Sequence, residues 1–150
     1  MSKIVEMLNK IKSWGDRHKN NGYSKVEPGL TMREIDEIVS EYDFKLPQEI
    51  IELYLWGNGG GFHNERFYEL SFYSLEDAVE KVQYKDFYSE EDSEYILFIG
   101  GQEDCYLWTD VKTEYTEIAF IYYNDEPTSS PIYPSFTAML ESIMENLEIN

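Results

Sequence analysis

The chain has 150 residues, of which 42% are hydrophobic and 16% aromatic, which is enough apolar material for one domain that folds without disulfides or metals. Thirty acidic residues against twelve basic ones give a net charge of −18, which repels nucleic acid and anionic lipid and either attracts a basic protein or serves solubility alone. The single cysteine, Cys105, excludes an intramolecular disulfide and a cysteine-based metal cluster. No signal-peptide pattern and no run of about 18 apolar residues occurs, so we expect a cytoplasmic protein without a membrane partner.

The first part of the chain predicts two helices separated by a loop. Residues 2–14 carry apolar side chains at helical spacing. Residues 16–29 are polar and interrupted by glycine and proline, which predicts a loop. Thr31 and Glu34 have the spacing of a capping box, in which each side chain bonds the other residue's backbone N–H, so a second helix is expected to begin there.

A third helix is predicted from the Leu46-Pro47 pair to about Trp56, with Pro47 in its first turn. Gly57 is expected to stop this helix, and residues 58–61 to form a turn into a sheet. The stretch WGNGGGFHNE from Trp56 has the composition of a phosphate-binding loop but not its placement. Such a loop puts its glycines between a strand and a helix, whereas these glycines follow a helix, at the negative end of its dipole. We therefore interpret the stretch as a marker of the fold.

The second half of the chain predicts an antiparallel meander closed by a helix. Residues 67–73 indicate a strand, and a capped amphipathic helix follows Ser74. Further strands are predicted at residues 94–99, 104–109 and 117–123. Residues 100–103 suit a hairpin between the first two, and an apolar stripe over residues 135–147 predicts the last helix. Helices followed by strands and a final helix indicate an α+β fold.

Two long sequence segments and their order resemble the SMI1/KNR4 family of the SUKH superfamily. They are TMREIDEIVSEYDFKLPQEIIELYLWGNGG from Thr31 and PSFTAMLESIMENL ending at Leu147. Between them, YILFIGG and CYLWTD are similar to the family's apolar strand, glycine turn and aliphatic strand. The resemblance covers about residues 30–147. Its signature residues are Leu46, Pro47, Trp56, Gly57, Asn58, Gly59, Ser135 and Phe136.

The resemblance implies a single SMI1/KNR4-like domain over residues 1–150, in which N-terminal helices and a C-terminal helix pack on an antiparallel β-sheet. Residues 1–29, an N-terminal helix and polar loop, precede the region of resemblance. No enzymatic activity and no cofactor are implied. Many bacterial relatives resemble immunity proteins that bind and neutralise toxins, often nucleases. The expected function is therefore an immunity protein that binds a basic toxin domain; the alternative is a regulatory scaffold like the fungal relatives, without a toxin partner.

The residues themselves offer little support for catalysis. His63 is a chemically competent base, but no serine or cysteine nucleophile lies near it in the sequence. His18 is the only other histidine, which excludes a multi-histidine zinc site. We therefore predict no catalytic, cofactor-binding or metal-binding residues. Trp56 and His63 remain candidates for positions near a binding surface.

The candidate partner-binding surface interleaves acidic and aromatic residues between the fourth predicted helix and the next strand. Aromatic side chains anchor interfaces, and carboxylates there meet Arg or Lys of a basic partner. The predicted residues are Tyr84, Asp86, Tyr88, Glu90, Glu91, Asp92 and Glu94, with a second group at Tyr123, Asp125 and Glu126. The alternative is a solvated loop whose tyrosine rings cover the edge of the sheet.

Overall fold

The computed structural model describes residues 2–18, 23–41, 46–64, 67–84, 95–100, 105–110, 118–122, 130–133 and 135–149. The helices are α1 (Lys3–Arg17), α2 (Met32–Val39), α3 (Gln48–Trp56), α4 (Leu75–Tyr84) and α5 (Phe136–Asn146). The strands are β1 (Tyr23–Pro28), β2 (Gly57–Asn64), β3 (Phe67–Phe72), β4 (Tyr95–Gly100), β5 (Cys105–Asp110), β6 (Ile118–Tyr122) and β7 (Ser130–Tyr133).

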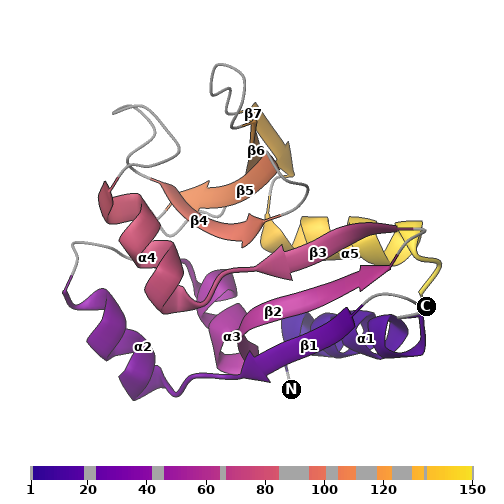
Figure 1. Ribbon diagram of the computed structural model, residues 1–150, viewed down its shortest axis with the longest axis horizontal. Coiled ribbons are helices and arrows are strands. Elements are labelled where there is room, and N and C mark those ends of the chain that lie inside the picture. Colours follow the sequence, from indigo (N-terminus) through magenta and orange to yellow (C-terminus); the bar gives the residue numbers. More distant parts are fainter. Residues whose placement is uncertain are drawn as a thin grey trace.

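The described strands form one antiparallel sheet in which each strand pairs with the next along the chain, from β1 to β7. Strands β4–β7 turn away from the direction of β1–β3, as the twist of antiparallel sheets requires (Figure 1). The pairing between β3 and β4 is short, with Ser71 opposite Gly100 and Phe72 opposite Ile99. Together with the helices, this sheet confirms the predicted α+β fold class.

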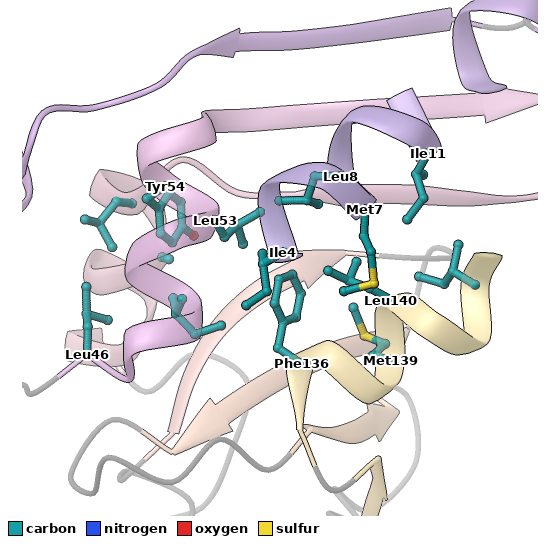
Figure 2. Packing of buried hydrophobic residues seen from close by; sticks show 14 of the residues in the cluster. Ile4, Met7, Leu8, Ile11, Leu46, Leu53, Tyr54, Phe136, Met139 and Leu140 are labelled. Carbon is teal, nitrogen blue, oxygen red and sulfur yellow. The ribbon is translucent and has the colours of Figure 1, made fainter. Parts of the chain in front are cut away.

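Helices α1, α3 and α5 pack together, and α1 and α3 both contact β2. Figure 2 shows the apolar side chains of α1 facing those of α5, with Met7 beside Met139 and Leu140. Each such side chain, when fully buried, stabilises the folded state by roughly 1.5–3 kcal/mol relative to leaving it exposed. The buried apolar residues are Ile4, Met7, Leu8, Ile11, Trp14, Ile35, Leu46, Ile50, Leu53, Tyr54, Leu75, Ala78, Val79, Phe136, Met139, Leu140, Ile143 and Leu147.

Helices α2 and α4 contact each other at one end of the molecule (Figure 1). The predicted capping box begins α2: the Thr31 hydroxyl accepts a hydrogen bond from the Glu34 N–H, and the Glu34 carboxylate accepts one from the Thr31 N–H. Of the residues in α2, Ile35 is buried, whereas α4 buries Leu75, Ala78 and Val79. Helix α2 therefore presents most of its surface to solvent.

Three sequence predictions require correction. Residues 16–29 were predicted as a loop, but Asp16 and Arg17 continue α1 and Tyr23–Pro28 form β1. Residues 58–61 were predicted as a turn, but they lie in β2. Pro47 is the N-cap of α3 and lies just before the first turn in which it was predicted. The first two errors share a cause, because β1 and β2 pair with each other and neither has the apolar alternation that marks a strand.

Candidate functional site

The two sequence segments that carry the resemblance meet at Glu49, in the first turn of α3. Its carboxylate accepts hydrogen bonds from the N–H groups of Phe136 (3.4 Å) and Thr137 (2.8 Å) and from the Thr137 hydroxyl (2.5 Å). The Ser135 hydroxyl accepts a further bond from the Ala138 N–H at 3.0 Å. The first N–H groups of a helix have no partner inside it and carry positive partial charge, so a carboxylate stabilises them. Glu49 therefore holds the start of α5 against α3.

We expect the Glu49→Ala variant to lower the free energy of unfolding by about 2 kcal/mol, because it leaves partly buried N–H groups of α5 without their acceptor. Urea denaturation followed by circular dichroism measures this loss. Glu52→Ala on the same helix is the matched control, because the Glu52 side chain forms no hydrogen bond with another described residue; its expected effect is within about 0.5 kcal/mol. Equal losses in the two variants would show that Glu49 does not hold α5.

Glycines are required in β2 because its backbone lies very close to β1 and to the segment just before α4. Gly59 and Gly60 have φ angles of +102° and +109°, a backbone conformation that residues other than glycine rarely adopt. A Cβ atom on Gly60 would lie 2.3 Å from the carbonyl oxygen of Lys25 in β1. A Cβ atom on Gly59 would lie 3.0 Å from the backbone nitrogen of Ser74, just before α4. These glycines thus have a structural role that needs no bound ligand.

Asn58 and Trp56, also signature residues, have structural partners as well. The Asn58 Oδ1 atom accepts a hydrogen bond from the Leu75 N–H at 2.9 Å, and its Nδ2 donates to Glu76 Oε1 at 3.0 Å. Asn58, in strand β2, therefore caps the start of α4. The Trp56 Nε1–H donates to Asn9 Oδ1 at 2.8 Å, which ties α3 to α1. These side-chain bonds explain why the Trp-Gly-Asn-Gly sequence marks the fold.

Tyr54 is fully buried in the last turn of α3, and its hydroxyl donates to the Tyr73 carbonyl oxygen at 2.9 Å. Burial raises the pKa of Tyr54 well above its ordinary value, and the carboxylates of Glu76 and Asp77 raise the pKa further. The hydroxyl therefore stays protonated at neutral pH and acts as a hydrogen-bond donor. Its bond to Tyr73 joins α3 to the segment between β3 and α4.

The predicted partner-binding residues fall almost entirely outside the described part of the chain. Tyr84 is the last residue of α4, and its side chain is not among those described. The remaining predicted residues outside the described part are Asp86, Tyr88, Glu90, Glu91, Asp92, Glu94, Tyr123, Asp125 and Glu126. The described flanks of the first group, α4 and β4, contact each other. The interface assignment therefore stays a prediction.

Helices α2 and α4 contact each other and both carry exposed carboxylates, a combination that sequence reasoning missed; we call these carboxylates the α2–α4 acidic surface. Its residues are Glu34, Asp36, Glu37, Glu41, Glu76, Asp77 and Glu80. Arg33 pairs with Glu37 at 3.2 Å and offsets one of these negative charges, which leaves the surface acidic. Acidic residues at helical spacing are typical of any solvated helix, and the contact between α2 and α4 is tertiary. The only sequence signal was therefore the high local density of acids.

No group of three or more His, Cys, Asp or Glu side chains in the described part of the chain is arranged to hold a metal ion. Among the helices that the structure describes, none combines the length and the apolar character needed to cross a membrane.

The sequence model of the SMI1 / KNR4 family (SUKH-1) matches residues 29–142, and the chain belongs to this family. The matched range contains Glu49, the glycine-rich strand and the start of α5, and it begins after α1 and β1. No curated protein matches the chain.

Proposed function

We propose that the protein is a non-enzymatic binding protein, and specifically an immunity protein that neutralises a cognate toxin by binding it. The observation that carries the proposal is membership of the SMI1/KNR4 family over residues 29–142. The net charge of −18 indicates that the partner is basic, because opposite charges speed association and suppress wrong partners. Nucleases fit this requirement, since they bind phosphates through lysine and arginine side chains.

The α2–α4 acidic surface supports the same proposal from the described residues. Its carboxylates are exposed, and Tyr84, the first predicted partner-binding residue, is the last residue of α4. The predicted acidic and aromatic stretch therefore continues directly from one of the two helices that form this surface. We propose that the surface and the stretch together meet the basic site of the toxin.

Co-expression with the product of the neighbouring gene tests the function. The expected result is survival of cells that make the toxin, and a tight complex whose association rate falls as salt rises from about 0.05 to 0.5 M, where screening shortens the reach of charges. Absence of a neighbouring toxin gene together with absence of protection would overturn the immunity function. Capture of housekeeping proteins instead would favour the regulatory scaffold.

Reversing Glu90, Glu91 and Asp92 to lysine is expected to weaken toxin binding about thirtyfold, equivalent to about 2 kcal/mol, without lowering the unfolding free energy. Surface plasmon resonance measures the affinity, and urea denaturation measures the stability. Glu27→Lys on the edge strand β1 is the control for charge alone, because Glu27 is exposed and remote in the strand order from β4. If affinity falls in proportion to the charge added in both variants, the stretch makes no local contact with the toxin.

A further inference from the structure

Helices α1 and α5 leave an open groove between them, with a volume of about 780 Å³. The two helices run side by side, as their contacts and Figure 1 show. A volume of this size accommodates several side chains of a bound segment. The lining residues are Lys3, Glu6, Met7, Lys10, Glu141, Met144, Glu145, Glu148 and Ile149.

The apolar part of the groove comes from two methionines and an isoleucine. Met7 is buried against the core, whereas Met144 and Ile149 are half-buried. Ile149 is held in place because its N–H donates to the Met144 carbonyl oxygen at 2.8 Å, after a turn at Glu148 with a φ angle of +57°. Methionine side chains are flexible and polarisable and adapt to the shape of a partner. The groove therefore has a defined apolar contact area.

The charged part of the groove is acidic. Lys3 pairs with Glu141 at 2.9 Å, so these two charges offset each other. Glu6, Glu145 and Glu148 form no ion pair with another described residue, and Lys10 is the other cation of the lining. Four carboxylates against two lysines leave a net charge of −2 around the apolar contact area.

Family membership does not assign this groove. Of its nine lining residues, Glu141 lies within the matched range 29–142, and the other eight lie outside it. The groove is thus built mainly by parts of the chain that the shared family pattern does not describe. A feature of this kind suits recognition of this protein's own partner.

We propose that the α1–α5 groove binds a basic amphipathic segment of the partner protein, with apolar side chains on the half-buried Met144 and Ile149 and lysine or arginine side chains beside Glu145 and Glu148. The inference rests on the proposed binding function and adds a second contact region to it. Charge complementarity selects this occupant: a second copy of the chain carries −18 itself and is repelled. A purely ionic ligand would leave the apolar contact area unused. Long cationic side chains satisfy both parts, because their aliphatic stems cover apolar surface while their charged ends reach carboxylates.

Nuclear magnetic resonance of the full chain labelled with ¹³C at the methionine methyl groups tests the proposal. Two synthetic peptides of equal length and positive charge serve as probes, one alternating lysine with leucine and the other lysine with serine. Met7 and Met144 report on the groove, and the exposed Met32 on α2 reports on general attraction to acidic surface. We expect saturable shifts at Met7 and Met144, with binding at least about tenfold tighter for the leucine peptide, while Met32 responds to the two peptides alike.

A charge-reversed variant, Glu145→Lys with Glu148→Lys, is expected to reduce leucine-peptide binding at Met144 about tenfold. It should remain folded, because lysine at the C-terminal end of a helix interacts favourably with the dipole. The matched control is Glu27→Lys with Glu52→Lys, which adds the same charge on β1 and α3, outside both proposed binding regions, and should leave the Met144 response unchanged.

In the peptide titration, no response at Met7 and Met144, or equal binding of the two peptides there, would overturn the groove proposal. Equal effects of the two variants on peptide binding would overturn it as well. So would methyl chemical shifts that change with protein concentration in the absence of peptide. The last would identify a second copy as the occupant. These outcomes are independent of the proposed function. A chain that protects against its toxin but fails the methyl test retains the function and loses the groove. A chain that binds the leucine peptide but protects against nothing loses the function.

Discussion

Replacing Gly60 with alanine is expected to lower the free energy of unfolding by about 3 kcal/mol, because two costs coincide at this residue. Its φ angle of +109° is unfavourable for a residue with a Cβ atom. The new methyl group would also lie 2.3 Å from the Lys25 carbonyl oxygen, so β1 has to move away from β2. That movement weakens the pairing of Val26 with Gly60 and Lys25 with Gly61. Urea denaturation and amide hydrogen exchange of β1 measure the two consequences.

Lys25→Ala provides the control for this position. The Lys25 side chain is 77% exposed, so its removal is expected to change stability by less than about 0.5 kcal/mol while the backbone pairing persists. A Gly60→Ala variant as stable as the parent protein, with unchanged exchange in β1, would contradict the close approach of the two strands.

Replacing Phe136 with alanine is expected to have a still larger effect, about 4 kcal/mol. The ring is 1% exposed and lies between α1 and α3 at the start of α5 (Figure 2). Its removal leaves a cavity that the helices fill only in part, because Glu49 continues to hold the α5 backbone in place through Thr137. Thermal and urea unfolding measure the loss, which should exceed that of Glu49→Ala.

Leu55→Ala tests whether the loss of stability comes from removing a buried side chain or from removing any large apolar side chain. Leu55 is also a large apolar residue but is 38% exposed, so its truncation is expected to cost less than about 1.5 kcal/mol. Similar losses for Phe136 and Leu55 would contradict the packing of α5 against α1 and α3.

The helices could be predicted from the sequence because their signals are local. The capping box of Thr31 and Glu34, the Ser74 cap of α4 and the apolar stripe of α5 all act within one or two turns or, for α5, three, and the structure contains each of them. Strands β3 to β6 were also predicted, since β-branched and aromatic residues dominate them. Local preference and tertiary environment agree in all these elements.

Strands β1, β2 and β7 illustrate where local signals fail. YSKVEP and GNGGGFHN lack apolar alternation, and β7 contains Pro131. The first two become strands through their pairing with each other, in which glycines allow an approach that other residues would block. Because the paired residues are about 35 positions apart, neither segment alone carries a sequence pattern that predicts the pairing. The same limit applies to Gly57, which ends α3 as predicted but with extended backbone as the first residue of β2.

The candidate sites show a similar division. The excess of acidic residues and the family signature were visible in the sequence, and together they gave the proposed class of partner. The α2–α4 acidic surface and the α1–α5 groove depend on which helices touch, and their residues are far apart in the chain. The predicted residues from Asp86 to Glu94 lie outside the described part and stay a prediction.

The packing of α1 against α5 also has a consequence for how the protein is made. Helix α1 leaves the ribosome before α5, and its apolar residues Ile4 and Met7 gain their α5 partners only after residues 136–146 have been synthesised (Figure 2). At roughly 5–20 residues per second, this interval lasts on the order of ten seconds. During that time the apolar face of α1 is a target for chaperones and for other nascent chains. Folding of the complete core is therefore a late, non-local event, and contacts between segments this far apart in sequence generally slow the folding of a domain.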